Sequence, residues 1–139
     1  MTALDETHDP QRRSWVDSAN RDGTDFPVQN LPFGVFSPAG GAPRFGIAIG
    51  DSILDVGLAR DAGLLAGTAA EAADTGRGGS LNALFALPPT HRIELRRQVA
   101  ALLDARTTPR PELLHEAAAC RLHLPAEIRN YTDFFAGIH

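Results

Sequence analysis

The feature that most constrains the fold of this chain is a regular alternation of side chains near the end of its first third. Apolar residues alternate with Gly or Ala over residues 45–49, and an apolar run resumes over residues 52–56. A repeat of two residues places every second side chain on the same face of a β-strand. The runs are separated by Gly50-Asp51, and a glycine at the first position of a two-residue loop suits a type II′ turn. The sequence therefore predicts a β-hairpin, with Phe45, Ile47 and Ile49 on its buried face.

A hairpin of two strands is not stable alone in water, so other parts of the chain must extend the sheet. Residues 33–37 mix aromatic, β-branched and turn residues, and residues 120–124 are the other available candidate. Pro27 and Pro32 lack an N–H donor, which keeps any strand that contains them short or at an edge. We therefore expect a small, strongly bent sheet or barrel.

The second half of the chain carries helical patterns. A short helix is expected over residues 81–85, capped by Ser80 and stopped by Pro88-Pro89. A longer helix is expected over residues 90–106, because its apolar residues recur at i, i+4, i+7 and i+8. The residues of this stripe are Leu95, Val99, Leu102 and Leu103, and the residues expected in solvent beside it are Arg92, Arg96 and Arg97.

Two further segments complete the predicted architecture. Residues 112–119 are expected to add one or two helical turns, and residues 66–79, rich in Ala and Gly, are expected to be a flexible connection. The predicted fold class is α+β, with a helical insertion in the second half at about residues 80–119.

At 139 residues the chain has room for one domain of ordinary size. Residues 1–22 are polar and charged, and we expect them to form a flexible arm with Trp15 tucked against the domain. Residues 23–125 are assigned to the barrel domain. Residues 126–139 are aromatic-rich and end abruptly, so we expect a linker and the truncated start of a further domain.

Charge and composition exclude several classes of function. The 13 cationic side chains, all arginine, are outnumbered by 17 acidic ones, whereas a domain that binds nucleic acid is normally basic. The sequence has neither an apolar run long enough to span a membrane nor a signal peptide. We therefore expect a cytoplasmic protein that binds neither nucleic acid nor membrane. The single cysteine excludes an internal disulfide, and the absence of lysine excludes a Schiff base formed by this chain.

Taken singly, the ionisable residues are weak indicators of function. His115 and His123 are eight residues apart, and no second imidazole is spaced to share one helical face as zinc ligands. Asp133 lies among aromatic residues, where a carboxylate is costly unless it is paired, hydrogen-bonded or bound to a metal. From the residues alone, a helix cap is preferred for Asp133 over a ligand role. The other candidates are expected to be structural or exposed: His8, His91, Asp51, Asp55 and Cys120.

Four segments stand out as ordered motifs. They are Ser14-Trp15-Val16 followed by residues 25–37, residues 46–55, Leu81-Asn82-Ala83-Leu84-Phe85, and residues 123–134 with Tyr131-Thr132-Asp133-Phe134. Together they resemble the fumarylacetoacetase (fumarylacetoacetate hydrolase) family. The resemblance covers about residues 14–139, which is nearly the whole chain.

The resemblance implies a fold and an activity. Members of the family cleave a carbon–carbon bond of fumarylacetoacetate, giving fumarate and acetoacetate in tyrosine and phenylalanine degradation. The family implies a small Src-homology-3-like β-barrel at the N-terminus, followed by a larger catalytic domain that holds Ca²⁺ or Mg²⁺, in an enzyme that is a homodimer. A hard cation can polarise the diketone oxygens, and a histidine can take the proton of the attacking water.

The resemblance also assigns roles to individual residues. It implies that Asp133 is a metal ligand and that Phe135 occupies a substrate-binding position, where the family's tyrosine is replaced and only apolar contact remains. The general-base histidine of the family would be the residue directly after His139. No catalytic residue is then expected within the chain, which should be inactive alone and should need the catalytic domain as its partner.

The sequence leaves two alternative functions open. A free-standing interaction module that uses the barrel as a binding surface would need an aromatic-lined groove, and Trp15 and Tyr131 are the only aromatic residues with a polar edge. A related acylpyruvase or other diketone hydrolase of the superfamily is disfavoured, because the smaller relatives mostly lack a long N-terminal domain.

Overall fold

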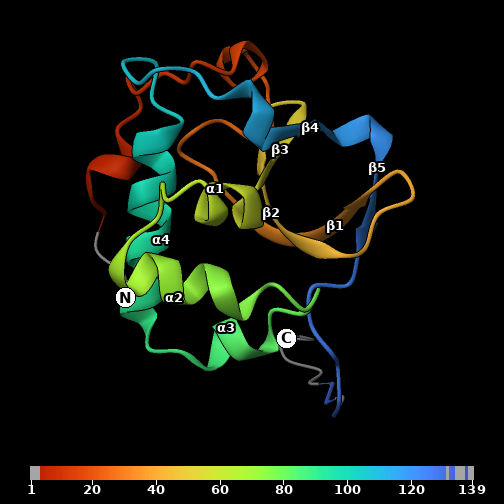
Figure 1. Ribbon diagram of the computed structural model, residues 1–139. Coiled ribbons are helices and arrows are strands. Elements are labelled where there is room, and N and C mark those ends of the chain that lie inside the picture. Colours follow the sequence, from red (N-terminus) through yellow and green to blue (C-terminus); the bar gives the residue numbers. More distant parts are fainter. Residues whose placement is uncertain (1–3, 131, 134–136, 138–139) are drawn as a thin grey trace.

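The computed structural model describes residues 4–130, 132–133 and 137. Within these residues a five-stranded antiparallel sheet stands beside four α-helices (Figure 1). The strands are β1 (Phe33–Pro38), β2 (Arg44–Ile49), β3 (Ser52–Asp55), β4 (Leu114–Glu116) and β5 (Cys120–His123), and the helices are α1 (Val56–Asp61), α2 (Gly67–Thr75), α3 (Asn82–Ala86) and α4 (Pro89–Leu102). Short 3₁₀ turns are η1 (Glu6–His8), η2 (Asp17–Asn20), η3 (Pro111–Leu113) and η4 (Ala117–Ala119). The α+β class is confirmed.

The predicted hairpin is present as β2 and β3. Its register places Ile49 opposite Ser52. Gly50 has a φ of +53°, and Asp51 has no positive φ, which is the pattern of a type II′ turn. The predicted strands at 33–37 and 120–124 are also present, as β1 and β5.

The sheet is strongly rolled but open. Its order is β4-β3-β2-β1-β5, and Glu116 and Cys120, on its two outermost strands, are joined through η4. Four residue steps reach at most about 14 Å, whereas four strand spacings of a flat sheet cover about 19 Å. The sheet must therefore curl to bring these edges together. No ladder joins β4 to β5 within the described residues, so the expected closed Src-homology-3-like barrel is not confirmed.

The main core lies between one face of the sheet and the helices. The predicted inward residues of β2 are buried, as is the predicted stripe of α4. Helix α2 packs chiefly on α4, and four of its alanines are buried: Ala69, Ala70, Ala72 and Ala73. The prediction of a flexible connection at 66–79 is therefore wrong. Alanine is the strongest helix former, and its small side chain lets α2 lie close to α4.

The boundaries of the predicted helical insertion are also wrong. Helices begin at Val56, well before residue 80, and residues 112–119 form η3, β4 and η4 in place of an α-helix. Strand β4 is only three residues long, and its pairing with β3 defines it. Leu81, and not Ser80, is the N-cap residue of α3, without a side-chain cap.

The N-terminal segment from Asp5 to Trp15 is packed against α4 and its end, where a flexible arm over residues 1–22 was expected. Ser14 forms a bridge with Asp104, and the Trp15 indole N–H donates to the carbonyl of Leu102 at 2.9 Å. The predicted tucking of Trp15 is therefore confirmed. These contacts hold the chain just after Leu102, where α4 ends four residues before the expected position.

The arginines expected in solvent along α4 are engaged in contacts. Arg96 donates to the Thr7 hydroxyl and to the carbonyl of Gln29, and Arg97 pairs with Asp5 at 3.2 Å. Arg92 donates to the carbonyl of Leu87 at 3.0 Å. These side chains fasten the N-terminal segment and the α3–α4 connection to the helix.

Candidate functional site

The segment after β5 leads toward the sequence-predicted site residues. Figure 1 shows it running away from the sheet and past α3. Asp133 is exposed near the end of this segment. Phe135 and His139 lie outside the described residues, and the expected general base would follow residue 139.

The beginning of this exit segment is clamped to the start of α3. The Leu81 N–H donates to the carbonyl of Pro125 at 2.7 Å. The Asn82 side chain accepts from the Glu127 N–H at 2.8 Å and donates to the Glu127 carbonyl at 3.4 Å. The Ser80 hydroxyl donates to the Asn82 amide oxygen at 2.7 Å. The point from which the chain continues toward Asp133 is thereby fixed on the domain.

The residues that the structure describes do not form a divalent-cation site of their own. Calcium prefers six to eight oxygen ligands and magnesium six. Among the residues that the structure describes, no group of three His, Cys, Asp or Glu could hold a metal ion. Among the described residues Asp133 is thus a single carboxylate, and a cation bound to it would need further ligands from elsewhere.

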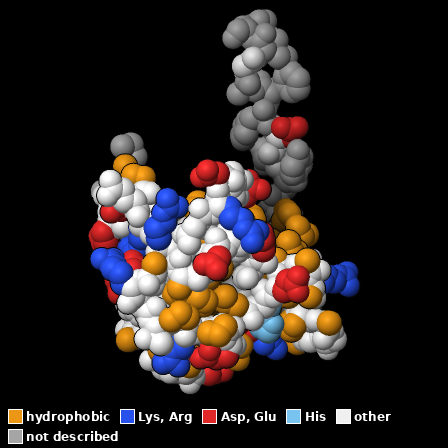
Figure 2. Space-filling view, turned by 90° about the horizontal axis from the view of Figure 1, so that it is seen from above, with side chains coloured by type: hydrophobic (Ala, Val, Ile, Leu, Met, Phe, Trp, Pro, Cys, Tyr) orange, Lys and Arg blue, Asp and Glu red, His pale blue; other side chains and the backbone are white. Residues whose placement is uncertain are grey.

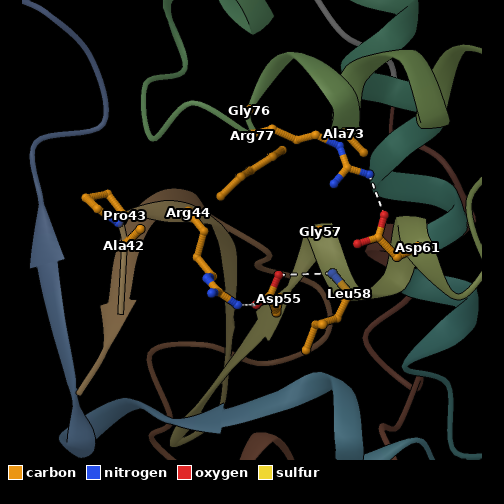
Figure 3. Close-up of a pocket in the computed structure, with 11 residues that line it drawn as sticks. Ala42, Pro43, Arg44, Asp55, Gly57, Leu58, Asp61, Ala73, Gly76 and Arg77 are labelled. Atoms are coloured by element: carbon orange, nitrogen blue, oxygen red, sulfur yellow. Dashed lines mark hydrogen bonds and ion pairs between the residues drawn. The ribbon is translucent and has the colours of Figure 1, made fainter. Parts of the chain in front are cut away.

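The pocket in Figure 3 lies between β2, β3, α1 and α2, and ion pairs form part of its wall. It has a volume of about 260 Å³, and Figure 3 shows Arg44 directed at Asp55 and Arg77 at Asp61. Buried Asp55 caps α1 by accepting the Leu58 N–H at 3.1 Å, and it pairs with Arg44 at 2.9 Å. Hydrogen bonding from Arg77 lowers the pKa of Asp61. Each of these charges has a partner, so the cluster is suited to holding the elements together.

The histidines are distributed over separate contacts. His91 pairs with Glu71 at 3.0 Å, and His115 lies 3.4 Å from Asp55. His123 contacts the Ser37 hydroxyl at 2.9 Å. Within the described part of the chain no carboxylate is bonded to His123, so this pair lacks the third group of a nucleophilic triad.

The surroundings of Cys120 do not activate its thiol. Cys120 is half-buried, and burial raises the pKa of its thiol, which opposes a reactive thiolate. Figure 2 shows arginine and acidic side chains interspersed on one face of the molecule, without one dominant basic patch. Among the described residues no helix is both long and apolar enough to cross a membrane.

Comparison with known proteins connects these features to a family. Residues 29–125 match the family model described as fumarylacetoacetase N-terminal. The chain belongs to the fumarylacetoacetase N-terminal family. It is 39% identical over 125 residues to fumarylacetoacetase from Caenorhabditis elegans, covering 84% of this chain and 29% of that protein. It is 36% identical over 122 residues to the Homo sapiens fumarylacetoacetase, covering 81% of this chain and 29% of the relative. The chain thus spans less than a third of these relatives, whose name is that of a hydrolase.

The fumarylacetoacetase motifs occupy defined places in the fold. Residues 46–55 form most of the β2–β3 hairpin, and Leu81-Asn82-Ala83-Leu84-Phe85 begins α3 and supplies the clamp. The family match ends at Pro125, which is itself a clamped residue. Sequence reasoning singled out Asn82 only as part of a motif, because its partner Glu127 lies 45 residues away.

Proposed function

We propose that this chain is the N-terminal part of a fumarylacetoacetase and serves as a scaffold for the catalytic domain that follows. The complete enzyme would hydrolyse a carbon–carbon bond of fumarylacetoacetate to give fumarate and acetoacetate. The observation that carries the proposal is the family match over residues 29–125, supported by relatives named fumarylacetoacetase at 33–39% identity. We propose that the rolled sheet corresponds to the Src-homology-3-like barrel of the family. The complete enzyme is proposed to be a homodimer.

Asp133 is the residue through which this chain would contribute to the active site. We propose that its carboxylate is one ligand of Ca²⁺ or Mg²⁺ and that the remaining ligands come from the catalytic domain. Two features support this role: the exposure of Asp133, and its position six residues beyond the clamped Glu127. A carboxylate is a hard oxygen donor of the kind these cations prefer. Phe135 is proposed to contact the substrate through apolar surface alone.

The cytoplasmic location of the protein stays a prediction.

The test uses the complete protein, meaning this chain continued over the length of its relatives. Asp133→Asn should weaken activation by Ca²⁺ or Mg²⁺ and reduce fumarylacetoacetate hydrolysis at least 100-fold, because the amide carries no negative charge. The control is Asp22→Asn, an exposed aspartate before the sheet, which should leave both within about twofold. Retention of normal cation dependence and rate by Asp133→Asn would overturn the assigned role.

A further inference from the structure

A stripe of exposed apolar side chains runs from β5 into the exit segment. Leu122, Leu124 and Ile128 are 72%, 74% and 74% exposed, although each is a large aliphatic residue. His123 and Pro125, which alternate with Leu122 and Leu124, are half-buried, and Ile128 follows directly after the clamped Glu127. This two-residue repeat is that of an extended chain with one side against the domain and its apolar side in solvent. Isolated exposed leucines are ordinary, but a contiguous apolar stripe marks an interaction surface.

The stripe is held in place and is therefore a formed surface. Its first part belongs to β5, which pairs with β1 from Val35 to Pro38. Its second part is held by the clamp, through the bonds of Pro125 with Leu81 and of Glu127 with Asn82. A partner can bind such a surface with little loss of conformational entropy.

The stripe continues into an apolar groove on the sheet. Leu122 lines this groove of about 230 Å³ together with Phe26, Pro32 and Gly34. Within the described residues β5 pairs only with β1, so its outer edge is also open. An open edge next to exposed aliphatic residues favours association unless another part of the protein covers it.

We propose that this docking surface, made of Leu122, Leu124, Ile128 and the groove beside them, is covered by the catalytic domain of the same polypeptide. The inference rests on the proposed function and names the face at which the two parts meet. The exit segment leaves the domain along this face, and the chain spans only 29% of its C. elegans relative, so most of such an enzyme follows from this point. The occupant is therefore apolar protein surface tethered directly beside the stripe.

Hydrogen exchange of this chain and of the complete protein tests the proposal. The amides of residues 120–128 should exchange at least tenfold more slowly in the complete protein, because the catalytic domain covers them. The amides of η1, at the other end of the chain, should exchange at similar rates in both. Equal exchange over residues 120–128 in the two proteins would overturn the proposed surface.

A pair of matched variants separates docking from folding. Leu124→Glu should increase exchange over residues 120–128 of the complete protein at least fivefold, and it should leave the thermal midpoint of the 139-residue chain within about 2 °C. Leu4→Glu, at a leucine that is 84% exposed, should change neither. Equal effects of the two variants on the complete protein would contradict the proposal. So would a 139-residue chain that is dimeric and becomes monomeric with Leu124→Glu, since the occupant would then be a second copy.

The two proposals fail in different ways. A complete protein that protects residues 120–128 but does not cleave fumarylacetoacetate would refute the proposed function and leave the docking surface standing. A complete protein that cleaves fumarylacetoacetate without that protection would refute the docking surface alone.

Discussion

Gly34 and Gly46 lie opposite each other on β1 and β2. A side chain at position 46 would clash with its neighbours, whereas one at position 34 would not. A Cβ atom on Gly46 would lie 2.5 Å from a methyl group of Ile53 and 2.6 Å from the ring of Phe36. A Cβ atom on Gly34 would meet nothing within 4 Å. The absence of a side chain at position 46 is what lets Phe36 and Ile53 pack together.

Gly46→Ala should therefore lower the free energy of unfolding by about 1–3 kcal/mol, the usual cost of overpacking a core. Gly34→Ala is the matched control and should be neutral or slightly stabilising, since alanine has less freedom to lose on folding. Urea denaturation followed by Trp15 fluorescence measures both. A similar loss of stability in the two variants would show that crowding at position 46 is not the cause.

Asp104 joins the N-terminal segment to the end of α4 through charge. Its carboxylate accepts from the Arg106 side chain at 2.8 and 2.9 Å. The carboxylate also forms an ion pair with Arg12, whose Nε atom lies 3.0 Å away. The Arg12 Nε–H group does not point at the carboxylate well enough to donate a hydrogen bond. The bonds from Arg106, with the charge of Arg12, hold the pKa of Asp104 well below its usual range.

Asp104→Asn should lower the free energy of unfolding by about 2–3 kcal/mol at pH 7, the scale of buried hydrogen bonds to charged groups. A lowered carboxyl pKa stabilises the folded state above the unfolded pKa of about 3.9 and loses that effect as the pH falls through the folded pKa. The difference between the variant and the parent should therefore narrow steadily below about pH 4 in urea denaturation at several pH values. A difference that stays constant from pH 7 to pH 2 would contradict a charge-based role.

At the scale of elements, the sequence predicted best those helices and strands whose type follows from a local pattern of apolar residues. The two-residue repeat of β2 and the stripe of α4 each identified both the element and its buried face. Helix α2 was missed because a run of alanines shows no contrast between apolar and polar faces, although Ala69, Ala70, Ala72 and Ala73 are all buried in the fold. Strand β4 was missed because three residues carry no pattern, and only pairing with β3 makes them a strand.

The N-terminal segment shows how long-range contacts override composition. Its polar sequence predicted an arm, yet Ser14 and Thr7 are buried and Arg12 lies against the end of α4. Trypsin should therefore cleave after Arg12 and Arg13 at least tenfold more slowly than after Arg129, whose side chain is 82% exposed in the exit segment. Mass spectrometry of a time course measures the order of the cuts. Early release of a fragment that starts at Ser14 would mean that the segment is detached in solution.

At the scale of the whole molecule, the sequence predicted the family but not how the exit segment leaves the domain. The motif around Asp133 directed attention to one carboxylate, which the structure places in an exposed segment. The clamp of Asn82 on Glu127 could not be predicted, because it joins residues that only the complete fold brings together. The same holds for the apolar stripe, since exposure of Leu124 depends on which side of the exit segment faces the domain.

Several charged side chains of the described residues are paired with one another within the domain. Asp55 and Asp61 are engaged by Arg44 and Arg77, and the histidines make separate contacts. No cluster of metal-binding side chains occurs in the described ranges 4–130, 132–133 and 137. Asp133 lies beyond the clamped Glu127, and the chemistry is proposed to need a second part of the protein.

A steady-state assay of fumarylacetoacetate cleavage tests whether catalysis needs the domain that is proposed to follow this chain. The 139-residue chain and the complete protein would be compared at equal concentration with Ca²⁺ or Mg²⁺ present. We expect no cleavage above background by the 139-residue chain and cation-dependent cleavage by the complete protein. Cation-dependent cleavage by the 139-residue chain alone would contradict it.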